Sequence, residues 1–277
     1  MLRSVIGLAR IGSGQDDRST VARASCPPPF FLVLAIMVIV MAILAGLANP
    51  THAETPAAQA SEVVWKQIGE ASGVVGMAAV GGKLFAATAT NKLMVCDPAA
   101  APVVWQQIGE TPGGVVAMGV AGGKLFASTS TRSGTLHMRE ALETAAAWQH
   151  IGHCWCCVGM AGTAASPGKI YGAIVVHNGA AGVAESIMVR ATTPSDVPWS
   201  SSKTTTRPPL GILAFAEVAG KFYAVTREDN LFVGDVTHDD VVWHVIGDAA
   251  GVTILAGGDG KLFATTKTGK LLMWTPK

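Results

Sequence analysis

The sequence predicts an all-β protein, a five-bladed β-propeller with four-stranded antiparallel blades. Three observations predict this fold: a repeat of about 43 residues present in five copies, four short apolar runs in each copy, and turn residues between the runs. Of the 277 residues, 49% are hydrophobic but only 6% are aromatic, a composition that suits closely packed strands. The net charge of +1 provides no strongly basic face, so nucleic acid is excluded as an expected partner.

The first 53 residues are expected to be a targeting segment. Phe30–Ala48 is a run of 19 residues without a charge, and arginines outnumber acidic residues before it. Small residues at Thr51 and Ala53 suit cleavage of a signal peptide after Ala53. The run is also close to the roughly 20 residues of a membrane span, so the alternative is an anchor retained through residues 30–48. Both interpretations place the rest of the chain outside the cytoplasm, periplasmic or secreted, with a linker at 54–61 and the propeller at 62–277.

Two landmarks define the repeat. The first is a tryptophan, which Ile-Gly follows three residues later in four of the copies, and the second is a Gly-Lys pair. Successive tryptophans are 40, 43, 51 and 44 residues apart, and successive Gly-Lys pairs are 41, 45, 52 and 40 residues apart. Because the two spacings agree, the copies are in register along the whole propeller region. The landmarks are Trp65, Trp105, Trp148, Trp199 and Trp243, with Lys83, Lys124, Lys169, Lys221 and Lys261.

Each copy is expected to contain four strands, which in the first copy cover residues 74–80, 83–88, 92–97 and 103–108. Gly81-Gly82 supplies the positive φ angles that a two-residue hairpin turn requires. The first strand consists of small residues and is placed innermost, and the strand that carries tryptophan is placed outermost. A tryptophan strand precedes the first inner strand, and the last copy lacks one. The N- and C-terminal strands are therefore expected to pair and close the ring.

The repeat resembles that of the five-bladed lectin propellers of the tachylectin type and, more loosely, tectonin repeats. The resemblance rests on the Trp-x-x-Ile-Gly strand, the Gly-Lys-Leu-Phe-Ala-x-Thr strand and the Lys-Leu strand, and it covers residues 62–277. It implies a non-catalytic protein that binds carbohydrate or a cell-surface glycan through repeated sites between blades, with no cofactor. The alternative is an exported scaffold for a protein partner, with its binding patch on the divergent residues 161–202.

Polar residues that recur in the loops of one face form the candidate ligand-binding site. Some of these polar residues directly follow Ile-Gly, and the others occupy the turn between the second and third strands of a copy. One tryptophan outside the repeat pattern adds an aromatic ring that could stack on a sugar. The alternative for each polar position is a solvated turn that needs a polar residue to satisfy its amides, and the alternative for the extra tryptophan is a core residue. The candidates are Glu70, Asn91, Glu110, Arg132, His153, Trp155, Asp229 and Asp248.

Catalysis is not expected. Glu217 is the one acidic residue on the five innermost strands, whereas glycosidases need two carboxylates that converge on the substrate. The region also lacks a phosphate-binding loop and a Gly-x-Ser-x-Gly turn. The lysines of the five Gly-Lys pairs are expected on the face opposite the candidate site. We interpret them as residues of solvated turns rather than as a binding site for a polyanion, because the net charge is close to zero.

The cysteines point to a disulfide or to buried thiols, and no metal site is expected. Cys154, Cys156 and Cys157 lie next to a histidine, but adjacent cysteines do not easily reach one zinc ion. An exported chain favours disulfides. The connectivity among these three cysteines and Cys96 stays open.

Overall fold

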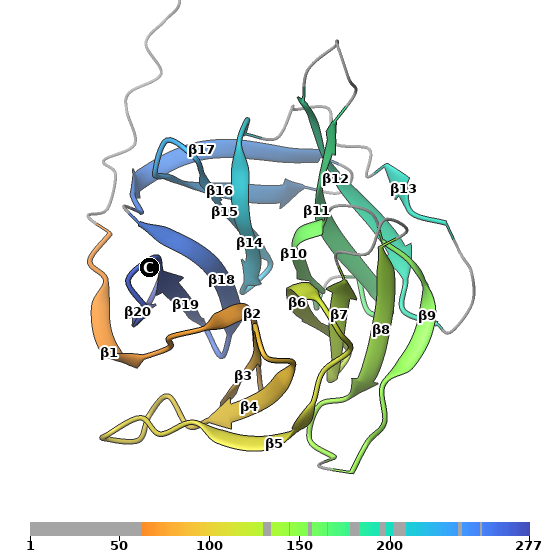
Figure 1. Cartoon of the computed structure of the whole chain (residues 1–277). Coiled ribbons are helices and arrows are strands. Elements are labelled where there is room, and N and C mark those ends of the chain that lie inside the picture. The colour runs from red at the N-terminus through yellow and green to blue at the C-terminus, as the bar shows by residue number, and fades with distance from the viewer. Residues whose placement is uncertain are drawn as a thin grey trace, which may run out of the picture. The chain divides into compact units, whose positions relative to one another are not determined.

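The computed structural model describes residues 63–277, apart from 130–133, 144, 155–156, 165, 178–182, 194–197, 202–208, 238–239 and 250. These residues form five four-stranded antiparallel sheets around a central axis (Figure 1). The predicted five-bladed propeller is confirmed. The predicted targeting segment (1–53) and linker (54–61) lie outside the described residues. Within the described part of the chain, no helix is long and apolar enough to cross a membrane.

Four blades are made of strands that are consecutive in the sequence, ordered from the axis outward. Blade 1 contains β2 to β5, blade 2 contains β6 to β9, blade 3 contains β10 to β13 and blade 4 contains β14 to β17. The strands are β1 (Lys66–Glu70), β2 (Val74–Val80), β3 (Lys83–Thr88), β4 (Lys92–Cys96), β5 (Gln106–Glu110), β6 (Val115–Ala121), β7 (Lys124–Thr129), β8 (Thr135–Glu140), β9 (Gln149–His153), β10 (Cys157–Ala161), β11 (Lys169–His177), β12 (Val183–Ala191), β13 (Ser200–Ser201), β14 (Ile212–Val218), β15 (Lys221–Thr226), β16 (Asn230–Thr237), β17 (Asp240–Asp248), β18 (Val252–Gly258), β19 (Lys261–Thr266) and β20 (Lys270–Trp274).

Blade 5 joins the two ends of the propeller region. β1 forms its outermost strand and pairs antiparallel with β20, with Lys66 opposite Met273 and Glu70 opposite Lys270. The closure predicted from the missing outer strand is therefore confirmed. In blade 1 the two inner strands begin and end where they were predicted, but the outermost strand begins only at Gln106, after the tryptophan.

The innermost strands β2, β6, β10, β14 and β18 approach each other so closely that some positions admit only glycine (Figure 1). A Cβ atom on Gly119 would overlap the backbone of Met160 in the next blade, and one on Gly257 would overlap the carbonyl of Glu217. Buried side chains such as Met77 and Met118 fill the remaining space between adjacent blades. The core is thus distributed between blades, and the axis is lined by backbone and small side chains.

Three of the five repeat tryptophans tie neighbouring blades together at the perimeter. The indole N–H groups of Trp105, Trp148 and Trp199 donate hydrogen bonds to backbone carbonyls at the end of the preceding outermost strand, over 2.7 to 2.9 Å. These carbonyls belong to Glu70, Glu110 and His153, respectively. The recurring tryptophan is accordingly a structural residue of the repeat.

Candidate functional site

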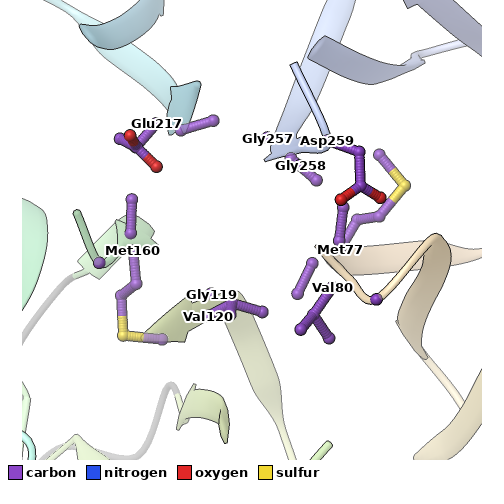
Figure 2. A pocket seen from close by; sticks show the side chains of 16 residues that line it. Met77, Val80, Gly119, Val120, Met160, Glu217, Gly257, Gly258 and Asp259 are labelled. Atoms are coloured by element: carbon purple, nitrogen blue, oxygen red, sulfur yellow. The ribbon is translucent and has the colours of Figure 1, made fainter. Parts of the chain in front are cut away.

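An axial pocket of about 220 Å³ opens on the face that carries the Gly-Lys turns (Figure 2). It is lined by the final residues of the innermost strands, which are mostly Gly, Ala, Val and Met. Two carboxylates, those of Glu217 and Asp259, are the charged groups among its lining residues. They come from adjacent blades and project beside the same opening (Figure 2).

Glu217 interrupts a series of small residues. The strand registers place Ala79, Val120 and Gly257 at the equivalent position of three other innermost strands, and in blade 3 Gly162 directly follows the end of β10. No other acidic residue occurs on the innermost strands, all of which lie in the described part of the chain. The carboxyl is therefore a single departure from the repeat, located where the axis opens to solvent.

The surroundings of Glu217 shift the pKa of its carboxyl upward. Burial among small residues raises the pKa of the carboxyl, and the backbone N–H of Gly220, 2.5 Å from Oε1, offsets part of this effect. A carboxyl with a raised pKa exchanges its proton closer to neutral pH than an exposed glutamate does. Such groups serve as general acids and bases in enzymes.

Asp259 occupies the turn after β18, where copies one and two have glycine. Its φ angle is +52°, a conformation that Asp and Asn tolerate better than most side chains. Its Oδ2 accepts a hydrogen bond of 2.9 Å from the backbone N–H of Gly82 in blade 1. The carboxylate thus links two turns at the rim of the axial pocket and adds negative charge there.

The turn residues predicted to bind a ligand lie on the face opposite the axial pocket, and they accept hydrogen bonds from neighbouring loops. Asn91 has a φ angle of +60°, its carbonyl accepts the N–H of Thr111 at 2.8 Å, and its Oδ1 accepts the N–H of Gly114 at 3.2 Å. Asp229 repeats this arrangement with φ +59°, and it accepts from Ala249 at 2.7 Å and Gly251 at 3.3 Å. Both side chains satisfy backbone amides of the loop that leads to the next blade.

The predicted residues that follow Ile-Gly end the outermost strands. Glu70 and Glu110 are exposed, as are His153 and Asp248. The structure brings Glu110 close to Asn91, because Glu110 pairs with Lys92, and in the same way it brings Asp248 close to Asp229. Each such pair belongs to its own blade, so the predicted residues do not converge on one pocket. Arg132 and Trp155 lie outside the described residues. That any of these residues contacts a ligand stays a prediction.

Three of the five Gly-Lys lysines are paired within their own blade. Lys83 contacts Asp97 at 2.9 Å, Lys124 contacts Glu140 at 2.9 Å and Lys221 contacts Asp235 at 3.0 Å. The six side chains are exposed, so each pair contributes little to stability. The pairing neutralises much of the lysine ring and favours the solvated-turn interpretation.

The disulfide that the structure shows joins two cysteines that are close in the sequence. Cys154 and Cys157 form a disulfide, and Cys96 is a free, buried thiol whose pKa burial raises to about 12. Cys156 lies outside the described residues. Among the residues that the structure describes, no group of three or more His, Cys, Asp or Glu side chains is arranged to hold a metal ion.

Two residues of the axial pocket carry a signal in the sequence. Glu217 is the one acidic residue on the innermost strands, although a glycosidase needs two converging carboxylates. Asp259 replaces the first glycine of the Gly81-Gly82 turn and is not among the predicted site residues. The polar residues Asn91 and Asp229 on the other face satisfy amides of their own loops.

Comparisons with known proteins identify the fold. No family model and no curated protein sequence matches the chain. Among solved structures, the chain is similar to Myxococcus xanthus glutaminyl cyclase, with a TM-score of 0.54, 16% identity, and coverage of 77% of this chain and 96% of that one. It is also similar to a glucose dehydrogenase, with a TM-score of 0.50, 11% identity, and coverage of 77% and 99%. At these identities the likeness establishes the propeller fold alone.

These comparisons correct the functional prediction. Both solved structures are enzymes by their descriptions, so a fold of this kind does not exclude catalysis. The predictions of a non-catalytic, lectin-like protein and of a scaffold in its place are wrong, because they inferred function from repeat motifs that specify the fold. Trp105, Trp148 and Trp199 of those motifs hydrogen-bond across neighbouring blades, and the Gly-Lys glycines adopt the positive φ angles of the turns, so both have structural roles.

Proposed function

We propose that the chain is an enzyme whose active site is the axial pocket and whose proton-transferring group is Glu217. The observation that carries the proposal is a carboxyl of raised pKa, alone on the innermost strands, at a pocket lined by Asp259 and otherwise by uncharged residues. Perturbed carboxyls in pockets are candidates for acid–base chemistry on physical grounds.

The charge and size of the axial pocket favour a small substrate that bears an amine. Glu217 and Asp259 are acidic, and no basic side chain is among the lining residues. A volume of about 220 Å³ is below the roughly 300–1,000 Å³ of pockets that enclose drug-sized ligands. The pocket therefore suits one end of a substrate, such as the terminal residue of a peptide.

Cyclisation of an N-terminal glutamine is the reaction that we place first, prompted by the description of one similar structure. In this reaction the α-amine attacks the side-chain amide carbon, a C–N bond forms, and ammonia leaves as the ring closes. Glu217 as carboxylate accepts one proton from the attacking amine and returns it to the departing nitrogen. The carboxyl ends in its starting state, so a single group serves as base and then as acid.

Two finer interpretations from the sequence also enter as proposals. The first is that the repeat of this chain is related to the repeats of tachylectin and tectonin propellers. This proposal concerns the repeat only and includes no sugar binding. Export through the apolar run at 30–48, with cleavage after Ala53 or retention as an anchor, is supported by the sequence pattern. N-terminal sequencing of the mature protein from its host tests the cleavage.

The experiment measures ammonia release from a glutaminyl dipeptide by the purified full chain and by Glu217→Gln. We expect the variant to lose about 10²- to 10⁴-fold in rate, the usual contribution of a general acid–base group. Glu110→Gln is the matched control, because Glu110 is an exposed glutamate at the end of β5 on the opposite face. Absence of turnover by the wild type would reject the reaction, and full activity of Glu217→Gln would reject the role of Glu217.

A further inference from the structure

Three histidines lie together on β8 and β9, the two outer strands of blade 2 (Figure 1). We call His137, His150 and His153 the histidine cluster. The ring centroids of His137 and His150 are 5.5 Å apart, those of His150 and His153 are 5.9 Å apart, and both pairs meet edge to face. His137 lies directly opposite His150 in the β8–β9 pairing, and its Nε2 is 2.9 Å from Oγ1 of Thr135. The paired strands therefore hold the rings close to one another.

The fold does not require histidine at these three positions. The strand registers identify the equivalent positions in three other blades, and none of them carries a histidine. The equivalent residues are Met94, Gln107 and Glu110 in blade 1, Phe232, Val245 and Asp248 in blade 4, and Leu272, Gln67 and Glu70 in blade 5. The histidine cluster is therefore a departure from the repeat, as Glu217 is on the axis.

The side chain of His137 points toward blade 1. Its neighbours on β8, Leu136 and Met138, pack against blade 3, and successive residues of a strand point to opposite faces. Ala127, which lies opposite His137 on β7, packs with Leu93 of blade 1. The two histidines of β9 share this face, because they pair with residues of β8 that point the same way.

The strands around the histidine cluster bring no carboxylate to it. These strands are β7, β8 and β9 of blade 2 and β4 and β5 of blade 1, all of which the structure describes. The charged side chain that shares the face of the cluster is that of Arg139, a cation 5.7 Å from the ring centroid of Trp148. The titratable side chains on the opposite faces of these strands are Lys92, Cys96, Glu110, Lys124 and Glu140.

Acid therefore acts against this arrangement. Burial and, to a smaller extent, the proximity of His150 lower the pKa of His137 from its ordinary value of 6.5. The unfolded chain then takes up this proton more readily than the folded chain, so the stability is complete above about pH 6.5 and is lost as the pH falls below it. Positive charges on neighbouring rings also repel each other across the β8–β9 pairing.

β9 also carries part of the joint between blades 2 and 3. The carbonyl of Ile151 accepts a hydrogen bond of 2.8 Å from the guanidinium of Arg190. The carbonyl of His153 accepts one of 2.7 Å from the indole of Trp199. Both donors come from blade 3, so a displacement of β9 away from β8 disturbs the contact between the two blades.

We propose that the histidine cluster is a pH-sensitive switch, which loosens β9 and the joint between blades 2 and 3 when mildly acidic solution protonates it. At higher pH the uncharged rings pack edge to face and β9 stays paired with β8. The switch does not involve Glu217 or the axial pocket, so its failure leaves the proposed function untouched.

The test follows amide hydrogen exchange of the full chain at about pH 8 and about pH 5.5, on either side of the ordinary histidine pKa. Protection factors are compared, because they correct for the direct effect of pH on exchange. We expect the protection of the β9 amides to fall at least about tenfold at the lower pH, as it would if one proton were bound about tenfold more tightly once β9 is released. The protection of β5, the outermost strand of blade 1, should stay unchanged.

His150→Gln is the decisive variant, because His150 is exposed, contacts both other rings, and has glutamine as its equivalent in blade 1. This variant, and likewise His137→Met, should lose most of the pH-dependent fall. His244→Gln is the matched control, because His244 is an exposed histidine of the outermost strand β17 and lies outside the cluster. It should keep the fall of the wild type. The proposal is overturned if wild-type β9 keeps its protection, if β5 loses as much, or if His150→Gln and His244→Gln behave alike.

Discussion

Replacing Gly257 by alanine should destabilise the propeller by forcing blades 4 and 5 apart. The added Cβ would overlap the carbonyl oxygen of Glu217 and would lie 2.8 Å from Cγ2 of Val218. The first obstacle is backbone, which cannot rotate away, so β18 or β14 must shift. Overpacking of this kind costs typically 1–3 kcal/mol, and the backbone contact favours the upper end, about 3 kcal/mol.

Thermal unfolding of the variant measures this cost. For a chain of this size, 1 kcal/mol lowers the melting temperature by roughly 2–4 °C, so a decrease of roughly 6–12 °C is expected. Gly109→Ala is the matched control, because a Cβ at Gly109, a strand glycine without positive φ, would meet no atom within 4 Å. It should leave the melting temperature unchanged or slightly higher. A Gly257→Ala variant as stable as Gly109→Ala would refute the close approach of the innermost strands.

Three further predictions concern stability. Because burial raises the pKa of Glu217, the folded state holds its proton more strongly than the unfolded state, and stability falls as pH rises from about 4.5 through the raised value. Melting curves should therefore show Glu217→Gln gaining on the wild type across that window and matching it at lower pH. Arg139→Met should cost about 2 kcal/mol in urea unfolding, because the buried guanidinium donates to two carbonyls, one at 2.6 Å, and stacks 5.7 Å from Trp148. Reduction of the Cys154–Cys157 disulfide should cost about 2 kcal/mol in the same assay, since the closed loop is short.

The sequence predicted the fold because the same pattern of four strands and their turns recurs in five copies. The Gly-Lys turns, the alternation of apolar runs and the unmatched tryptophan strand each follow from local rules, and they agree on one closed ring. The unmatched tryptophan strand and the missing outer strand of the last copy predicted the pairing of the terminal strands that β1 and β20 show. The outermost strand of blade 1 was predicted too early, because the residues around Trp105 are apolar without pairing in the sheet.

The predicted ligand-binding residues lie on the face opposite the axial pocket, and their recurrence has a physical reason. Asn91 and Asp229 recur because positive φ angles and unpaired loop amides require them, and this requirement is repeated in several blades. A functional residue on the axis shows the opposite pattern, a single departure from an otherwise small series, as Glu217 does. Its raised pKa depends on burial by neighbouring blades, which no local pattern specifies.

The most direct test of the account is to locate where an amine-bearing substrate binds. Amide chemical shifts of the labelled full chain are recorded during titration with a glutaminyl dipeptide, using Glu217→Gln to slow turnover. The account predicts saturable shifts that centre on Gly119, Gly162 and Gly257 around the axial pocket. Shifts that centre on Glu70, Glu110 and Asp248 on the opposite face, or no saturable shifts at all, would contradict it.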